Sequence, residues 1–226
     1  MKTRNETDMN EQRENGKIGG LAESLVIAFS MYSRIPMPMV AWTEKGMKYA
    51  LCFFPAVGIA VGAAVAAFWQ LSRLLGLGDL SRLCVETALP LLITGGIHMD
   101  GFLDTVDARS SHQSRERKLE ILKDPHAGAF AIAGCGVYLL FYAAAFSELS
   151  PEAFPGIAGV FVMSRALSGY SVVTFPKAKK DGLVTAFAKG ASQAPAAVSG
   201  ILLCWLVGGF FWILLTGGLV MALAAG

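Results

Sequence analysis

The sequence predicts an all-α, polytopic integral membrane protein with about five to seven transmembrane or re-entrant helices. Hydrophobic residues make up 54% of the 226 residues and charged residues only 16%, which is more apolar than an ordinary soluble domain. Apolar runs recur along the chain, and Lys and Arg concentrate in the hydrophilic segments between them. The net charge of +2 is too small to indicate a nucleic-acid partner, so the bilayer is the expected partner.

The N-terminal part is predicted to contain no complete crossing. Residues 1–20 are polar with mixed charge, which indicates a disordered cytoplasmic tail ahead of a single membrane-embedded domain over 21–226. Residues 21–33 are apolar but reach only about half the length needed to span, and Pro36 and Pro38 stop a helix there. An interfacial or re-entrant helix is therefore expected at 21–33.

The later apolar segments are predicted to cross the membrane. They are residues 49–72, 83–97, 127–147, 153–173 and 195–225. The last could form one tilted helix or a hairpin broken at Gly217-Gly218. Small residues on the 49–72 helix offer a packing face and permit homo-oligomerisation. The four cysteines are far apart without a metal-ligand spacing, so they are interpreted as buried packing residues.

Lys and Arg predict the orientation in the cytoplasmic membrane. The tail and the segments 34–48, 98–125 and 174–194 are basic, whereas the turn at 148–152 has no Lys or Arg. Because cytoplasmic loops carry the excess of Lys and Arg, the long hydrophilic loops are expected on the cytoplasmic side.

The stretch TGGIHMDGFLDTVD, residues 94–107, carries the main chemical signal. A helix through it places Asp100, Asp104 and Asp107 at i, i+4 and i+7 on one face. Three neighbouring carboxylates repel one another unless a cation lies between them, and all-oxygen ligands suit Mg²⁺. A solvated acidic helix face is the alternative. Gly96, like its glycine neighbours, lets a ligand approach the backbone and is a candidate substrate contact.

Two further residues could complete this site. Asp124 precedes Pro125 just before a span and could turn back to complete the metal shell. His98 lies beside the aspartates but not on their face, so general base, substrate hydrogen bonding and a structural role all stay open. The chain shows no activated serine or cysteine nucleophile and no phosphate-binding loop, which favours direct transfer of a phosphoryl-type group to a hydroxyl.

Basic residues are candidates for binding a polyanionic substrate. Arg117 and Lys123 lie in and after a short amphipathic helix predicted at 115–122, and they either contact phosphate or form a solvated basic face. Arg165 lies inside an apolar span, where it must face a polar cavity and pair with a ligand phosphate, an aspartate or another helix.

Two more basic residues are ambiguous. Arg34 ends an apolar stretch and either binds substrate or extends its charged group to the membrane surface. Lys180 belongs to a basic loop that either binds substrate or attracts lipid headgroups.

These residues resemble the cobalamin synthase family, which consists of adenosylcobinamide-GDP ribazoletransferases. The resemblance covers most of residues 20–190 and is most specific in GGIHMDGFLDTVD and in 115–130. It extends to Arg34-Ile35-Pro36, to residues 54–58, to Ser164-Arg165, and to Asp181-Gly182-Leu183 with Phe187.

The resemblance implies a Mg²⁺-dependent membrane enzyme whose catalytic domain is 21–226. Such an enzyme joins adenosylcobinamide-GDP to α-ribazole or α-ribazole 5′-phosphate, releases GMP and yields adenosylcobalamin or its phosphate. By analogy with CDP-alcohol phosphotransferases, Asp104 or His98 is the candidate that deprotonates the attacking hydroxyl. Family members continue into a Gly-rich Thr-Gly-Asp segment beyond the last span, and this chain does not contain that segment, so either that end is missing here or this member is short.

Two other classes remain as alternatives. One is a CDP-alcohol phosphotransferase or a prenyltransferase acting on lipid. The former carries Ala-Arg two residues after its Asp-Gly pair, where this chain has Phe102-Leu103-Asp104-Thr105 after Asp100-Gly101, and the latter favours an Asp-Asp-x-x-Asp or Asn-Asp type of pair that is absent here. The other is a transporter that uses the acidic cluster for cations. Binding of nucleotide-activated cobinamide distinguishes the first interpretation from both.

Overall fold

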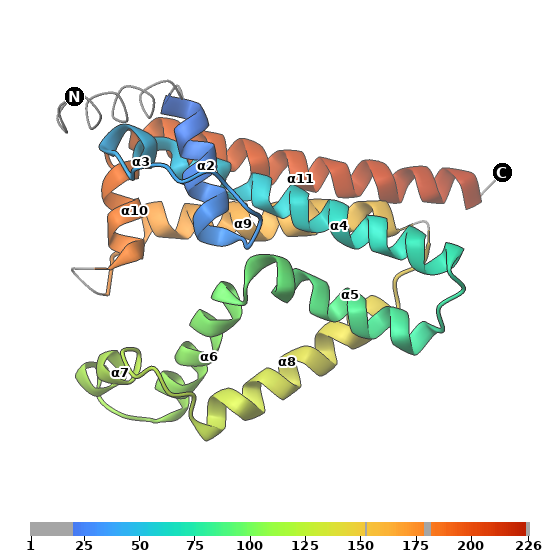
Figure 1. Cartoon of the computed structure of the whole chain (residues 1–226), viewed down its shortest axis with the longest axis horizontal. Coiled ribbons are helices and arrows are strands. Elements are labelled where there is room, and N and C mark those ends of the chain that lie inside the picture. The colour runs from blue at the N-terminus through green and yellow to red at the C-terminus, as the bar shows by residue number, and fades with distance from the viewer. Residues whose placement is uncertain (1–19, 152, 179–181, 225–226) are drawn as a thin grey trace, which may run out of the picture. The chain divides into compact units, whose positions relative to one another are not determined.

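The computed structural model describes residues 20–151, 153–178 and 182–224, and every regular element in these ranges is a helix (Figure 1). The elements are α2 Gly20–Tyr32, α3 Glu44–Ala50, η1 Leu51–Phe53, α4 Phe54–Leu74, α5 Asp79–Thr94, α6 Ile97–Ser110, α7 Arg115–Ile121, α8 Ala129–Ser147, η2 Phe154–Gly156, α9 Ile157–Thr174, α10 Leu183–Ala191 and α11 Pro195–Ala224. The predicted tail lies outside the described residues, apart from Gly20, where α2 begins.

The helix lengths confirm a polytopic membrane protein. Four helical stretches in the described ranges are long and apolar enough to cross a bilayer, and α5 with α6 makes a fifth if this pair, bent by 95°, is one span. The four stretches are Glu44–Leu74, Ala129–Ser147, Phe154–Thr174 and Pro195–Thr216. The helix α2 has only 13 residues, as its short apolar run predicts. The helix α11 is continuous, so the single-helix alternative for the C-terminal run is confirmed.

Two predicted loops are partly helical instead. The first crossing was expected from 49, but helix begins at Glu44, because the Thr43 side chain accepts the Gly46 N–H at 3.1 Å and caps α3. The polar segment 174–194 contains α10, because the apolar side chain of Phe187 is buried and holds a helix against α3.

Contacts divide the chain into two compact units, each made of segments distant in sequence. The first comprises residues up to 59 with 160–211, and the second comprises 60–159 with 212 onward. Each unit includes part of α4, α9 and α11, so the units do not follow the chain order. The expectation of one domain over 21–226 therefore stays a prediction.

The first unit has a densely packed core around α2, α3 and α10. Phe187 and Leu51 are almost fully buried in it, and Tyr32 stacks on Phe54 with ring centroids 4.0 Å apart. A Cβ atom at Gly190 would lie 2.6 Å from the Met47 carbonyl oxygen, so glycine permits α10 to contact the backbone of α3. The core members are Ile27, Met47, Ala50, Leu51, Cys52, Phe187, Ala191, Val198 and Leu202.

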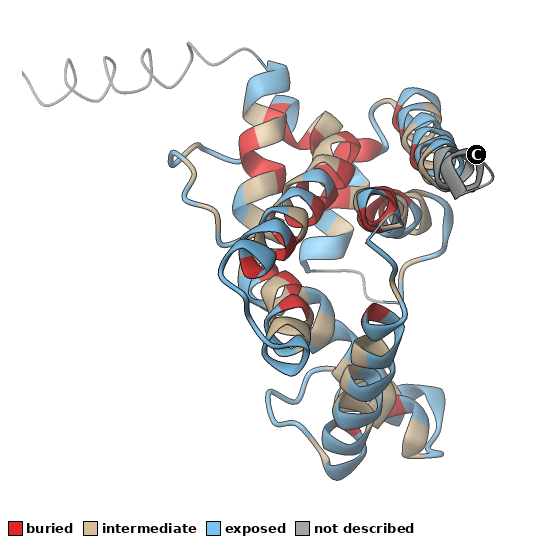
Figure 2. Ribbon diagram, turned by 90° about the vertical axis from the view of Figure 1, so that its right-hand side faces the viewer, coloured by how far each residue is buried: buried red, intermediate tan, exposed pale blue. Residues whose placement is uncertain are grey.

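The second unit is arranged along α8, against which α5 and α6 pack. A series of aromatic contacts follows this helix, and Tyr142 and Phe146 stack with ring centroids 4.8 Å apart. The helices α6 and α7 bury few residues (Figure 2). Ala108 is the buried residue of α6, and α7 has none. The polar side chains of α6 and α7 are therefore exposed or half-buried.

The prediction that all four cysteines are buried packing residues is wrong. Cys52 is buried and Cys135 is half-buried, but Cys84 and Cys204 are exposed on α5 and α11. An apolar helix face in a membrane protein can meet lipid as well as protein, and hydrophobicity alone does not separate the two.

Candidate functional site

The acidic motif lies on α6, which starts at a sharp corner of the chain. Gly95 and Gly96 have φ angles of 67° and 77°, a left-handed conformation that glycine adopts most readily. They end α5 and bend the chain by 95° before α6 begins. The Gly96 carbonyl then accepts the Asp100 N–H at 2.9 Å. Gly96, predicted to contact substrate, thus has a conformational role in the structure, and its contact with substrate stays a prediction.

The predicted helix through the motif is confirmed over Ile97–Ser110. Asp100, Asp104 and Asp107 therefore lie on successive turns of one helix. Asp100 is exposed, whereas Asp104 and Asp107 are half-buried. His98, in the first turn of the same helix, is exposed. The three aspartates of the motif thus share one short helix, from Asp100 in its first turn to Asp107 in its last.

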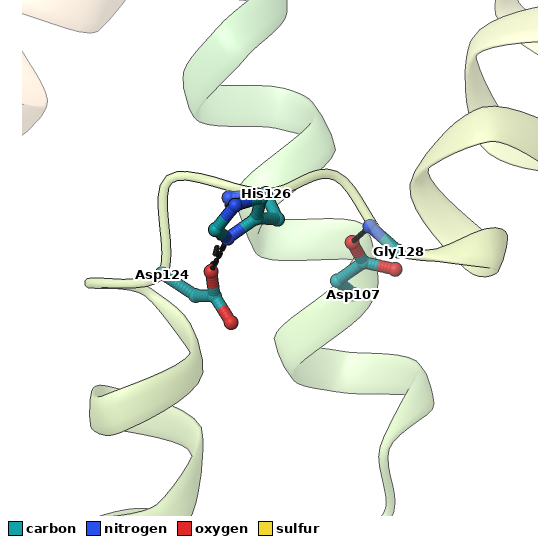
Figure 3. Close-up of polar contacts among 4 residues, drawn as sticks. All are labelled: Asp107, Asp124, His126 and Gly128. Carbon is teal, nitrogen blue, oxygen red and sulfur yellow. Dashed lines mark hydrogen bonds and ion pairs between the residues drawn. The ribbon is translucent and has the colours of Figure 1, made fainter.

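Asp107 forms the most specific contact in this region. One carboxylate oxygen accepts the Gly128 N–H at 2.6 Å (Figure 3). The other accepts the Ala131 N–H at 2.8 Å. Both donors belong to the start of α8, so Asp107 serves as the cap of a helix that begins about twenty residues later. This contact was not predicted from the sequence.

On the N-terminal side of Asp107, α6 packs closely against α8. A Cβ atom at Gly134 would lie 3.0 Å from a methyl carbon of Val106, and Phe102 lies against Tyr138 with ring centroids 5.5 Å apart. Residues that come earlier on α6 meet residues that come later on α8, so the two helices are antiparallel. These contacts bring α6 and α8 side by side next to the point where Asp107 reaches Gly128.

The segment between α6 and α8 carries the basic candidates. The helix predicted at 115–122 is present as α7, Arg115–Ile121, capped by Ser114, which accepts the Arg117 N–H at 3.4 Å. The Arg117 guanidinium donates to Glu120 at 2.6 Å, and both side chains are mostly exposed. Lys123 is also exposed. Both cations are therefore accessible to a ligand, and phosphate binding stays a prediction for each.

Asp124 turns toward His126 in the loop before α8. Its Oδ1 accepts the His126 backbone N–H at 3.0 Å and lies 2.8 Å from His126 Nδ1 (Figure 3). These bonds hold the pKa of Asp124 below its usual range, the backbone N–H of His126 contributing most and its ring next. An aspartate two residues before its donor is a common turn pattern, so this pairing was visible in the sequence but was not recognised.

The predicted Mg²⁺ shell consists of Asp100, Asp104, Asp107 and Asp124. In the described part of the chain, no group of three or more His, Cys, Asp or Glu side chains is arranged to hold a metal. Asp107 and Asp124 already accept backbone N–H groups. Asp100 and Asp104 lie one helical turn apart on α6, and each carries carboxylate oxygens. Their chemistry fits Mg²⁺, which usually takes one or two carboxylates together with water and substrate phosphates.

The other predicted binding residues belong to the first unit. Arg165 is buried on α9 with its guanidinium over the Phe161 ring, 5.3 Å from the centroid. Arg34 is exposed just after α2. Lys180 lies outside the described residues. Substrate binding by these three residues stays a prediction.

Comparison with known proteins identifies close relatives. A family model described as cobalamin-5-phosphate synthase matches residues 24–226. The chain is 51% identical over 179 residues to an adenosylcobinamide-GDP ribazoletransferase of Lachnoclostridium phytofermentans, covering 79% of this chain and 69% of that protein. It is 33% identical to an adenosylcobinamide-GDP ribazoletransferase of Clostridium botulinum strain Eklund 17B, over 75% of this chain and 68% of that protein. It is 31% identical to one from Treponema denticola, over 81% of this chain and 70% of that protein. No solved structure matches the chain.

Proposed function

The chain belongs to the cobalamin-5-phosphate synthase family and is an adenosylcobinamide-GDP ribazoletransferase, and we propose the reaction and the residues that carry it. The proposed substrates are adenosylcobinamide-GDP and α-ribazole or α-ribazole 5′-phosphate. The proposed products are GMP and adenosylcobalamin or its 5′-phosphate. The relatives' names support the first substrate, and the acidic face of α6 supports phosphoryl transfer.

The proposed reaction is a single displacement at phosphorus. A ribazole hydroxyl oxygen forms a bond to the phosphorus attached to cobinamide, the bond from that phosphorus to the bridging oxygen breaks, and GMP leaves with that oxygen. The hydroxyl proton passes to a base. We propose Asp104 or His98 for this role, because both lie on α6 beside Asp100.

Asp100 and Asp104 are proposed to hold Mg²⁺, which when bound neutralises diphosphate charge and stabilises the leaving oxygen. Arg117 and Lys123 are proposed to contact substrate phosphates, because their cationic groups are exposed in the segment that follows α6. In this arrangement basic residues would contact the polyanion, and Asp100 and Asp104 would act on the reacting phosphate through a bound cation.

The helices also support a location in the membrane. Their length and apolar surface suit a multi-pass protein of the cytoplasmic membrane. We propose that α6 and α7 face the cytoplasm, because the segment 98–125 is rich in Lys and Arg and cytoplasmic loops are enriched in these residues. This is also where a nucleotide-activated substrate is available.

Turnover in membranes that contain the full chain tests the proposal. We expect a corrinoid product and GMP from adenosylcobinamide-GDP plus α-ribazole only when Mg²⁺ is present, and almost none from Asp104→Asn. Parallel assays with α-ribazole 5′-phosphate and with a lipid alcohol define the acceptor. Product from the lipid alcohol alone, or turnover unaffected by chelation of Mg²⁺, would contradict the proposal.

A further inference from the structure

The start of α8 lacks a cap of its own. The first N–H groups of a helix have no carbonyl partner within it, and the residue before the helix often supplies a side-chain oxygen instead. Here that residue is Gly128, which has no side chain. Asp107 supplies both oxygens from α6, one to the N–H of Gly128 and one to that of Ala131. The negative carboxylate also suits the positive end of the helix dipole.

Gly128 is needed for this contact because of space. Its φ of −82° and ψ of 175° are accessible to any residue, so backbone conformation does not require glycine. A Cβ atom there would lie 2.8 Å from each Asp107 carboxylate oxygen, closer than Cβ atoms approach other atoms in proteins. An alanine at this position therefore pushes the carboxylate away from the two N–H groups it accepts.

The same contact closes a hairpin. The chain leaves α6 after Asp107, passes through α7 and the pair Asp124–His126, and returns to α6 at Gly128 (Figure 3). On the N-terminal side of Asp107, the close approach of Val106 and Gly134 continues the packing of the two helices. Asp107 is thus the polar contact at the point where the returning chain meets α6.

From these contacts we propose that Asp107 is a positioning residue. Its carboxylate holds the start of α8, and with it the segment that carries Arg117, Lys123 and Asp124, in register with the acidic face of α6. Asp100 and Asp104 then bear the proposed metal contacts, and Asp107 acts through the helix that it caps. The effect on catalysis rests on the proposed function; the fastening of α8 does not.

Hydrogen–deuterium exchange on the full chain in lipid nanodiscs tests the fastening directly. We expect amides in the first turn of α8 to exchange about tenfold faster in Asp107→Asn and in Gly128→Ala than in the unchanged protein. The double variant should exchange no faster than either single variant, because both break one contact. Asp100→Asn, which removes the same charge about two turns away on α6, should leave these amides unchanged. Unchanged exchange in both Asp107→Asn and Gly128→Ala would overturn the proposal.

Kinetics then separate positioning from metal binding. A positioning role predicts that Asp107→Asn and Gly128→Ala lower kcat by a similar factor, about tenfold or more, with the Mg²⁺ concentration for half-maximal rate unchanged. A raised Mg²⁺ requirement in Asp107→Asn alone would identify a metal ligand and overturn the positioning role. Should the unchanged chain make no corrinoid product, the proposed function fails, while the exchange result still decides whether Asp107 fastens α8.

Discussion

The α2–α3–α10 region and the α6–α7–α8 hairpin are held together by different means. In the first, apolar side chains such as Phe187 are buried, and Gly190 lets two backbones touch. In the hairpin, Gly128 instead makes room for a carboxylate, and the polar side chains of α6 and α7 are mostly exposed or half-buried. Packing thus determines the stability of the first region, whereas a few polar contacts position the groups of the second. Substitutions in the two regions should therefore change different properties.

The largest effect is expected in the packed region. Phe187→Ala should lower the free energy of unfolding by about 3–5 kcal/mol, because it removes a fully buried aromatic ring from the core. Unfolding in mixed micelles at increasing denaturant measures this loss. Phe175→Ala, at a ring that is 65% exposed, is the matched control and should change stability little. Equal losses of stability in the two variants would mean that burial of Phe187 does not stabilise the α2–α3–α10 region.

The next largest effect is expected in the hairpin, where a substitution should lower turnover without changing stability. Asp104→Asn should lower kcat by about 10²–10³-fold, since the variant loses a proposed Mg²⁺ ligand or base. Its unfolding midpoint should stay that of the unchanged protein. Asp79→Asn, at an exposed aspartate near the start of α5, serves as the charge-matched control. A variant at Asp104 that unfolds early but turns over normally would show that this residue is structural.

A smaller effect should distinguish two glycines. Gly190→Ala should cost about 1–3 kcal/mol, because the new methyl group meets the Met47 carbonyl oxygen at 2.6 Å and backbone cannot easily move away. Gly200→Ala on α11 has open space around the added atom and should be neutral or slightly stabilising. Thermal unfolding of the two variants side by side measures the difference. Equal midpoints would mean that α3 and α10 are not closely packed.

The smallest effect is expected at the cap of α7. Ser114→Ala should destabilise this exposed helix by about 0.5–1 kcal/mol, measured as faster amide exchange within α7 only.

The pKa of Glu116 is lowered, first by a bond from its own backbone N–H and then by Ser114. A lowered carboxyl pKa stabilises the folded form above the unfolded value and loses this effect as the pH falls through the folded value. Protection of α7 should therefore decline below about pH 4.5, and a decline only near pH 7 would contradict this assignment.

The sequence predicted much of the hairpin and less of the packed region. The spacing of Asp100, Asp104 and Asp107 predicted α6, because helical periodicity is local information. The start of α3 was missed although Thr43 is a helix-capping residue, since Lys45 and Lys48 were interpreted as loop residues. Phe187 belonged to the family resemblance, but the surrounding lysines made the segment look like a loop.

Other features depend on distant contacts that one sequence does not contain. The glycines at the start of the motif were interpreted as positions where a ligand approaches the backbone, and the bend of 95° that they make between α5 and α6 was not predicted. The bond from Asp107 to the N–H of Gly128 joins residues 21 positions apart, and neither residue type signals the other. The four-carboxylate metal shell stays a prediction, and the hydrogen bonds that Asp107 and Asp124 accept from backbone N–H groups are contacts that the spacing of charges does not show.

The corner at Gly95 and Gly96 ends α5 before this helix is long enough to cross a bilayer of typical thickness. The 16 residues of α5 extend only about 24 Å, which is shorter than a hydrocarbon core of about 30 Å. If α5 lies along the membrane normal, this hydrophobic mismatch favours local thinning of the bilayer around the corner. In that orientation, lipids with shorter acyl chains reduce the mismatch and bring the corner closer to water without any change in the protein.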